Sequence, residues 1–168
     1  MTPSPLVISA AQPEDLATIR VLLGEYANWL ATTTGADMES VHTEPVFARL
    51  AQEIQGLPGE YQPPDGALLM ARLDEQPAGM VALRRLDAHR CEMKRLYVRA
   101  AARGAGVGRQ LAEHVIAAAR IRGYRDMLLD TLPEMPDAQR LYIALGFRDI
   151  TPYYESPLPG TRYMALQL

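Results

Sequence analysis

The sequence predicts one α/β domain built on a mixed, mostly antiparallel sheet with helices on its faces. Three strand-like segments follow one another with short polar connections at 74–77 and 87–90, which is typical of antiparallel hairpins. A strand, a helix and another strand come next, and such a crossover joins parallel strands. With 168 residues, 48% of them hydrophobic, the chain is long enough to bury a core as a single domain spanning 1–168.

The beginning of the chain predicts an edge strand and a helix. Leu6–Ser9 is a short apolar run. Pro13 and the two acidic residues after it are typical of a helix start, because proline suits the first turn and acids complement the helix dipole. Apolar residues then recur at helical spacing as far as Leu30, and the segment Thr32–Gly35 ends the helix.

The next part of the chain predicts a second helix, a loop and the three hairpin strands. A helix that begins near Thr43 carries Phe47, Leu50 and Ile54 on one face. Leu57–Gly66 contains three prolines and two glycines and is expected to be a loop. The three strands are expected at Ala67–Leu73, Ala78–Leu86 and Cys91–Val98.

The second half of the chain predicts two further helices and three strands. One helix starts near Val107 and stops at Gly123, and another covers Pro136–Leu145 with Gly146 as its stop. The strands are expected at Met127–Thr131, Phe147–Ile150 and Tyr163–Leu168, with a loop at Thr151–Gly160.

Composition and charge exclude several classes of protein. The formal charge of −3 and the pI of about 5.6 argue against a nucleic-acid partner. The single cysteine, Cys91, cannot form an intrachain disulfide, which fits a reducing compartment. The sequence contains neither a signal-peptide pattern nor an apolar run long enough for a membrane helix. We therefore expect a cytoplasmic protein without a membrane partner.

A glycine-rich loop carries the strongest chemical signal. Arg103–Gly108 lies between a predicted strand and a predicted helix, where free helix N–H groups and glycine backbone can surround a phosphate. The P-loop pattern fails because Gly108 is followed by Arg109 and Gln110 rather than Lys and Ser or Thr. The dinucleotide fingerprint fails because Arg109 stands where its last glycine is needed. A different nucleotide-phosphate binder remains an alternative at this point.

The same loop resembles motif A of the GNAT superfamily of N-acetyltransferases. Arg103, Gly106 and Gly108 stand at the defining positions of the pattern R/Q-x-x-G-x-G/A. The preceding Lys94–Val98 looks like that family's fourth strand, and Leu141–Phe147 is similar to its late L-Y-x-x-x-G-F element. The resemblance spans nearly the whole chain, is closest to small bacterial members, and implies the acyl-CoA N-acyltransferase fold.

The resemblance implies that acetyl-CoA is the co-substrate. It would lie where the fourth and fifth strands separate, with its pyrophosphate on the loop amides and its pantetheine arm along the fourth strand. The residues implied are Leu96, Tyr97, Val98, Arg103, Gly104, Ala105, Gly106, Val107, Gly108 and Arg109. The residues His42, His89, His114 and Cys91 show no metal-ligand spacing, so their spacing predicts no metal site.

Two residues are candidates for proton transfer during acetylation. Glu92 lies on the predicted fourth strand, where family members often place a carboxylate, and is the candidate base. The alternative is a surface glutamate paired with a neighbouring arginine such as Arg84 or Arg85. Tyr142 matches the tyrosine of the late family element and is the candidate acid for the departing thiolate. Its alternative is a packing role on an amphipathic helix.

Two further positions near the expected cleft bear on this assignment. Asp130, at the end of the fifth strand, is either a second functional carboxylate or a strand-end residue. Met135 is a departure from the family, because many relatives have at this place an asparagine that contacts the pantetheine arm.

The resemblance also implies that the acceptor binds between the first two helices and the loop that joins the last two strands. The candidates are Tyr26, Trp29, Tyr153 and Tyr154. Aromatic rings beside an acidic residue can bind a cationic amine, whereas the alternative is packing of a proline-stiffened loop onto the sheet. The acceptor is either a small-molecule amine or a protein amino group. The oligomeric state is open, and a homodimer is compatible with the sequence.

Together these observations predict an enzyme that transfers an acetyl group from acetyl-CoA to a primary amine by direct attack in a ternary complex. The alternative is a non-catalytic module that binds or senses acyl-CoA. A local excess of positive charge favours a bound polyanion in either case, because no acidic residue occurs between Met93 and Ala112. That stretch contains Lys94, Arg95, Arg99, Arg103 and Arg109 and predicts a basic phosphate pocket.

Overall fold

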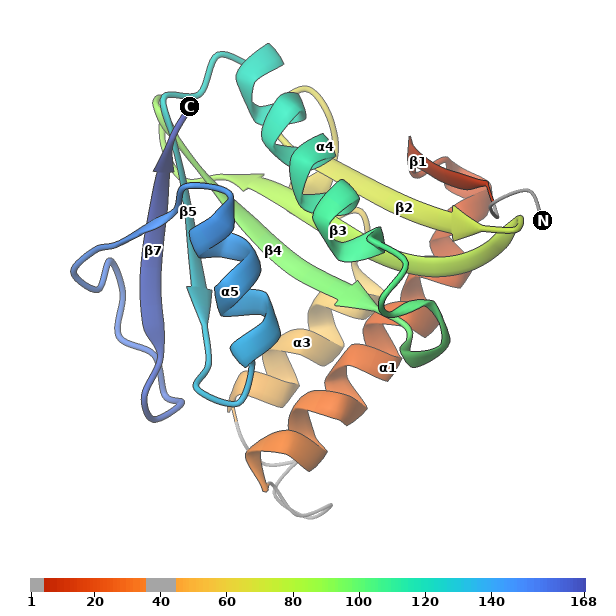
Figure 1. Cartoon of the computed structure of the whole chain (residues 1–168), viewed down its shortest axis with the longest axis horizontal. Helices are drawn as coiled ribbons and strands as arrows, with labels where there is room; N and C mark the ends of the chain where they lie inside the picture. Colours follow the sequence, from red (N-terminus) through yellow and green to blue (C-terminus); the bar gives the residue numbers. More distant parts are fainter. Residues whose placement is uncertain (1–4, 36–44) are drawn as a thin grey trace.

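Seven strands form one sheet in the order β1-β2-β3-β4-β5-β7-β6 in the computed structural model, which describes residues 5–35 and 45–168 (Figure 1). The strands are β1 (Leu6–Ala10), β2 (Ala67–Leu73), β3 (Gln76–Arg85), β4 (Arg90–Val98), β5 (Asp126–Thr131), β6 (Arg148–Asp149) and β7 (Arg162–Gln167). Strands β4 and β5 run parallel, and the other neighbouring pairs are antiparallel. The predicted mixed, mostly antiparallel sheet is confirmed.

Helices cover both faces of the sheet. They are α1 (Leu16–Thr34), α3 (Pro45–Gln55), α4 (Val107–Ile121) and α5 (Pro136–Ala144). Helices α4 and α5 lie on one face, and α1 and α3 lie on the other (Figure 1). Along β3, Val81 and Leu83 pack with α4, whereas Met80 and Ala82 pack with α1 and α3. Both faces of the central strands are therefore buried, which explains their nearly continuous apolar sequences.

Strands β4 and β5 stay together over a short distance only. Their parallel register joins Arg90–Glu92 to Asp126–Leu128 and ends there. Beyond this point β4 continues as far as Val98, paired with β3 alone. We call the point at which the pairing ends the β4–β5 split. One edge of β4 is left without a neighbouring strand from the split onward.

A bulge in β4 lies just beyond the split. Met80 of β3 faces Tyr97, and Ala82 faces Lys94, so β4 has one more residue than β3 over this interval. Arg95 lies inside the bulge with φ of 60°, in the left-handed region that residues other than glycine rarely adopt. The bulge bends β4 and strengthens its twist, which accounts for its divergence from β5.

Several predicted boundaries shift. The expected loop at 74–77 is a tight turn at Asp74 and Glu75, with φ of 51° and 66°, so that β3 begins at Gln76. Positive φ at both central residues is the requirement of a type I′ hairpin turn, which normally selects Asn-Gly. The strand predicted at Phe147–Ile150 is confined to β6, and the loop Leu57–Gly66 contains a short 3-10 turn whose Tyr61 is buried.

The helix start expected near Thr43 lies outside the described residues. The start predicted at Pro13 is a 3-10 turn at Pro13–Asp15, which α1 continues. Gly35 ends α1 in the left-handed conformation, as predicted. Within 5–35 and 45–168, we find no helix that is both long enough and apolar enough to cross a membrane.

Candidate active site

The glycine-rich loop connects β4 to α4. After Val98 and a short 3-10 turn, Gly104 and Gly106 adopt φ of 82° and 76°, and Gly106 is the N-cap residue that precedes α4. The helical hydrogen bonds of α4 start with the Gln110 N–H, which donates to the Gly106 carbonyl at 3.1 Å. The N–H groups of residues 107–109 therefore lack acceptors within the helix and are free to hold an anion.

Neither packing nor backbone conformation within the chain requires a glycine at position 108. A Cβ atom there would lie 3.5 Å from Val98 Cγ2 and 4.0 Å from Leu141 Cδ2, which are ordinary contacts. Its φ is not in the left-handed region either. An alanine side chain would therefore fit the protein itself at this position.

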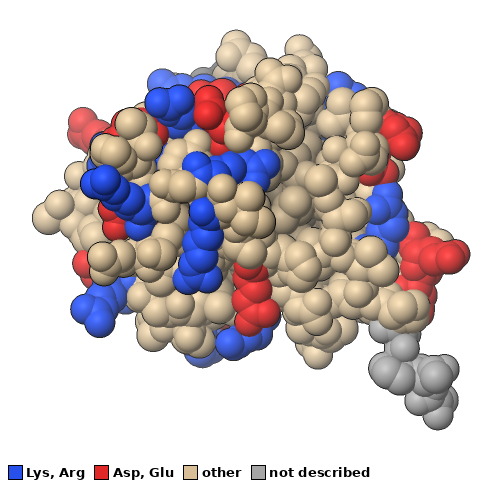
Figure 2. All heavy atoms as spheres, turned by 90° about the horizontal axis from the view of Figure 1, so that it is seen from above, with Lys and Arg blue, Asp and Glu red and all other residues tan. Residues whose placement is uncertain are grey.

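Most of the basic side chains of the predicted phosphate pocket have an acidic partner in the structure. Arg95, Arg99 and Arg109 pair with Glu53, Glu25 and Glu113 at 2.7, 3.0 and 2.8 Å, and Lys94 lies 3.7 Å from Glu92. Arg103 donates to the Val98 carbonyl at 3.1 Å and has no acidic partner within the described residues. On the face seen in Figure 2, basic side chains gather over one part of the surface with acidic side chains beside them.

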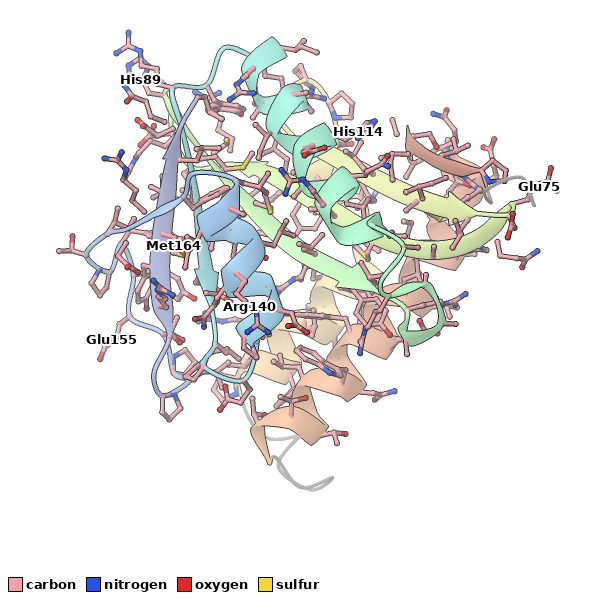
Figure 3. All side chains as sticks on the ribbon, in the orientation of Figure 1. Glu75, His89, His114, Arg140, Glu155 and Met164 are labelled. Atoms are coloured by element: carbon pink, nitrogen blue, oxygen red, sulfur yellow. The ribbon has the colours of Figure 1, made fainter. Side chains whose placement is uncertain are left out.

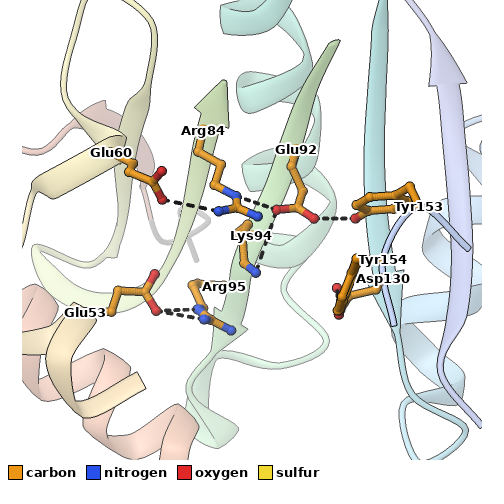
Figure 4. Close-up of polar contacts among 9 residues, drawn as sticks. All are labelled: Glu53, Glu60, Arg84, Glu92, Lys94, Arg95, Asp130, Tyr153 and Tyr154. Atoms are coloured by element: carbon orange, nitrogen blue, oxygen red, sulfur yellow. Dashed lines mark hydrogen bonds and ion pairs between the residues drawn. The ribbon is translucent and has the colours of Figure 1, made fainter. Parts of the chain in front are cut away.

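Glu92 is buried at the centre of a polar network (Figure 4). Its side chain is 1% exposed, although it is charged. Arg84, its cross-strand neighbour on β3, donates from Nε to Glu92 Oε1 at 2.6 Å, and the Tyr153 hydroxyl donates to Glu92 Oε2. The sequence-based alternative was right about the pairing with Arg84, but Glu92 is not a surface residue.

Lys94 and Arg95 lie on the same side of β4 as this network. The Lys94 ammonium, 19% exposed, sits 3.7 Å from Glu92 Oε1, and burial lowers its pKa. The Arg95 guanidinium holds Glu53 of α3 through Nε at 2.9 Å and Nη2 at 2.7 Å. Both belong to the stretch for which the sequence predicts a basic pocket. Glu53, the partner of Arg95, comes from α3, whereas Glu92, the partner of Lys94, lies on the same strand.

The loop between β6 and β7 brings two tyrosines over the β4–β5 split. The Tyr154 hydroxyl donates to Asp130 Oδ2 of β5 at 2.6 Å, beside the bond from Tyr153 to Glu92. The rings of Tyr153, Tyr154 and Tyr163 pack edge to face with centroid separations of 5.4–5.5 Å. Burial, and then the neighbouring carboxylates, raise the pKa of Tyr153 and of Tyr154, so both hydroxyls stay protonated as donors.

An open depression of about 610 Å³ lies against the same loop. Its lining includes the three packed tyrosines and Glu155, which Figure 3 shows at the outer edge of the loop. The depression gives the tyrosine cluster one side that faces solvent. Tyr154 is the more exposed member, at 42%.

Tyr142 reaches toward the split from the opposite face of the sheet. It lies on α5, is 7% exposed, and its ring centroid is 5.7 Å from that of Phe147. We find no hydrogen bond to its hydroxyl among the described residues. Burial raises the pKa of Tyr142, and the charges of Tyr26 and Asp130 raise it further. The packing role and the proposed acid role are both compatible with this position.

The two acceptor candidates of α1 lie side by side, and Tyr26 is next to the bulge of β4. The Tyr26 ring lies 6.2 Å from the rings of Trp29 and Tyr97, and Arg95 Cζ lies 5.8 Å from the Tyr26 centroid. Burial raises the pKa of Tyr26. The link to the β6–β7 loop runs through Leu158, which packs in the same apolar cluster as Trp29.

Met135 packs into this apolar cluster too. It stands at the position where many relatives have a polar contact to the pantetheine arm, so the chain uses the position for packing between α5 and α1. Thr131 Oγ1 lies 3.8 Å from the Met135 sulfur.

The two histidines in the described residues lie away from this site. His89 is at the end of the sheet and His114 is on α4 (Figure 3), where His114 Nδ1 lies 2.7 Å from the Gln110 carbonyl. His42 is outside the described residues. Among the residues in 5–35 and 45–168, no group of three or more His, Cys, Asp or Glu side chains could hold a metal ion.

We expect the Cys91 thiol to resist modification in the folded protein. It is fully buried, lies 3.6 Å from the Asp126 carbonyl, and has a pKa raised to about 12 by burial. Because the thiolate is the reacting form, dithiobis(nitrobenzoate) at pH 8 should leave the native protein almost unmodified and release one equivalent after unfolding. Fast reaction of the folded protein would contradict this burial.

Comparisons with known proteins agree with this arrangement. The Acetyltransferase (GNAT) family profile matches residues 26–147. An uncharacterized N-acetyltransferase of Schizosaccharomyces pombe is 36% identical over 171 residues, covering 100% of this chain and 98% of the relative.

Solved structures show the same fold. An acetyltransferase from Streptococcus agalactiae has a TM-score of 0.75 at 23% identity, covering 97% of this chain and 98% of that chain. The PaiA N-acetyltransferase from Thermoplasma acidophilum, solved in complex with coenzyme A, has a TM-score of 0.69 at 18% identity, covering 98% and 99%. The chain therefore belongs to the GNAT family of acetyltransferases and is an acetyl-CoA-dependent N-acetyltransferase.

Proposed function

We propose that the protein transfers the acetyl group of acetyl-CoA directly to a primary amine, with both substrates bound at the β4–β5 split. The observation that carries this proposal is the convergence at the split of a free β4 edge, a glycine loop and the buried carboxylate of Glu92. The first two suit the co-substrate, and the carboxylate suits the removal of a proton from the acceptor.

The acetyl-CoA site is proposed on β4 and on the loop that follows it. The unpaired edge over Leu96–Val98 can accept the amide groups of the pantetheine arm as a short additional strand. The pyrophosphate would lie on the amides from Arg103 to Arg109, where three glycines leave the backbone open. A relative of the same fold binds coenzyme A, which supports this choice of ligand.

Two side chains are proposed for proton transfer. Glu92 would accept the proton that the acceptor ammonium loses, and Tyr142 would protonate the departing thiolate. Burial raises the pKa of Tyr142, so its hydroxyl stays neutral and can donate a hydrogen bond to the departing thiolate. The acceptor amine is proposed to enter between α1, with Tyr26 and Trp29, and the loop tyrosines Tyr153 and Tyr154.

The Gly108→Ala variant should change the affinity for acetyl-CoA without lowering the stability of the fold. The added methyl group meets only ordinary contacts, and alanine is the better helix former by up to about 1 kcal/mol, so the thermal midpoint should be equal or higher. The same methyl group projects where the pyrophosphate is proposed, so the Kd for acetyl-CoA should rise about tenfold, the effect of losing roughly 1.4 kcal/mol of binding. Calorimetry with acetyl-CoA checks this, and unchanged affinity would place the pyrophosphate elsewhere.

A panel of amines tests the transfer itself. Incubation with acetyl-CoA and a series of small primary amines, amino acids and peptides should release coenzyme A thiol with at least one class. Acetyl-CoA binding without release for any amine would instead favour the alternative, a module that binds or senses acyl-CoA. Cytoplasmic location and a homodimer stay predictions, which fractionation and sedimentation would check.

A further inference from the structure

Both oxygens of the Glu92 carboxylate are already engaged. Oε1 receives Arg84 at 2.6 Å and has Lys94 at 3.7 Å, and Oε2 receives the Tyr153 hydroxyl. With a side chain that is 1% exposed, Glu92 offers no free surface to an incoming amine. A proton that ends on Glu92 must pass through one of its partners.

Tyr153 is the one of these three partners that can pass a proton on. The Arg84 guanidinium stays cationic, and the Lys94 nitrogen lies 3.7 Å from Glu92 Oε1, beyond hydrogen-bond distance, whereas the Tyr153 hydroxyl donates to Glu92 Oε2 and has lone pairs that can accept. Tyr153 is half-buried and belongs to the tyrosine cluster that lines the open depression, so it lies between Glu92 and solvent.

We propose that Tyr153 relays the acceptor's proton to Glu92. This inference rests on the proposed function and adds a catalytic residue to it. The Tyr153 oxygen takes a proton from the acceptor ammonium as its own hydroxyl proton moves to Glu92 Oε2. The neutral amine then attacks the thioester carbon, the C–S bond breaks, and the second nitrogen proton ends on the thiolate by way of Tyr142. Glu92 returns its proton to solvent through Tyr153, so the sum is R–NH3⁺ and acetyl-CoA giving the amide, coenzyme A thiol and H⁺.

The surroundings of Tyr153 suit this role. The ionisable groups that face it are Glu92, Asp130, Tyr154 and Tyr163, with Arg84 and Lys94 behind Glu92. Burial and the carboxylates raise the pKa of Tyr153, so its hydroxyl stays neutral over the pH range in which an alkyl ammonium begins to lose its proton. Arg84 and Lys94 hold the Glu92 oxygen that Tyr153 does not use, which fixes the orientation of the carboxylate.

The pH dependence of the Tyr153→Phe variant tests the relay. With the acceptor that the amine panel identifies, turnover at pH 7 should fall about 10²-fold. The loss should shrink toward a few-fold at pH 9.5, because an alkyl ammonium with a pKa near ~10.4 is then partly neutral without help. A purely structural role for the hydroxyl would give the same loss at both values.

Tyr163→Phe is the matched control. Its hydroxyl accepts from the Ser156 N–H at 3.1 Å within the same ring cluster, but does not touch Glu92. This variant should show any loop disturbance as a loss that does not change with pH. Glu92→Gln should reproduce the pH-dependent loss, and adding Tyr153→Phe to it should cost less than twofold more.

Failure of the proposed acetyl transfer and failure of the Tyr153 relay give different results. If wild-type protein transfers to no amine at any pH, the proposed function itself is wrong. If wild-type protein is active and Tyr153→Phe loses nothing, or loses the same factor at pH 7 and pH 9.5, the relay is wrong and Glu92 receives its proton by another route. Thermal unfolding of each variant shows that the comparison is made between folded proteins.

Discussion

Replacement of Glu92 with glutamine should lower kcat at pH 7 by about 10²–10⁴-fold, the usual contribution of a general base. The Kd for acetyl-CoA should stay within about threefold, because the proposed contacts to coenzyme A lie on the backbone of Leu96–Val98 and on the glycine loop, not on this side chain. Initial rates and calorimetry on the same preparation check both expectations. Full turnover in the variant would remove Glu92 from the mechanism.

The structure makes this substitution mild for the fold. Glutamine keeps an oxygen for Arg84 Nε, and its amide can donate to the Tyr153 oxygen, so no buried polar group is left without a partner. Arg84 is 30% exposed and also lies 3.3 Å from Glu60, so its guanidinium keeps an acidic partner in the variant. We expect a loss of stability of about 1–2 kcal/mol, within the range for charged hydrogen bonds.

Glu60→Gln is the matched control for that prediction. Glu60 pairs with the same arginine, but its side chain is 71% exposed. Exposed ion pairs contribute about 0–1 kcal/mol, so this variant should keep both its stability and its turnover. A similar loss of activity in both variants would mean that the position of Arg84, rather than the base, controls the rate.

The sheet could be predicted because its signals are local. Alternating burial along β3, with Met80 and Ala82 on one face and Val81 and Leu83 on the other, produces a run that is apolar at nearly every position. The hairpin connection was predicted at 74–77, but its two-residue form was not, because neither Asp74 nor Glu75 is the glycine that such a turn normally selects. The same is true of the bulge, where the positive φ falls on Arg95. At these positions the residue type does not indicate the backbone conformation that the sheet imposes.

The glycine loop and both proton-transfer candidates could be named from the sequence, but their surroundings could not. The burial of Glu92 depends on Tyr153, which lies 61 residues later and reaches it through the fold. The ion pairs of the basic stretch could not be predicted either. Glu25 of α1 and Glu53 of α3 are distant in the sequence but pair with Arg99 and Arg95 in the fold. A charge count over one stretch of the sequence includes the arginines but leaves out the glutamates that pair with them.

Gly79 is a residue whose importance only the packing shows. It lies on β3 opposite Val98, and a Cβ atom there would be 2.5 Å from the Tyr97 carbonyl oxygen and 3.3 Å from Val98 Cα. These are backbone atoms, which cannot rotate away as a side chain can. Gly79→Ala must therefore push β3 and β4 apart, and we expect a loss of about 2–3 kcal/mol in the free energy of unfolding, typical of an overpacked core.

The same substitution should weaken acetyl-CoA binding, because the displaced segment is the one proposed to pair with the pantetheine arm. Denaturant unfolding and calorimetry measure the two effects separately. Gly24→Ala in α1 is the control: nothing lies within 4 Å of the added Cβ, so stability should rise by up to about 1 kcal/mol with binding unchanged.

These glycine variants separate two causes of weak binding. Gly108→Ala is expected to reduce affinity in a fully stable protein, which can only reflect contact with the ligand, whereas Gly79→Ala is expected to reduce affinity and stability together. If Gly79→Ala bound acetyl-CoA as tightly as wild type despite its lower stability, the edge of β4 over Leu96–Val98 would not be where the pantetheine arm lies. The glycine loop would then hold the co-substrate by itself, and Gly108→Ala would have to show a correspondingly larger loss.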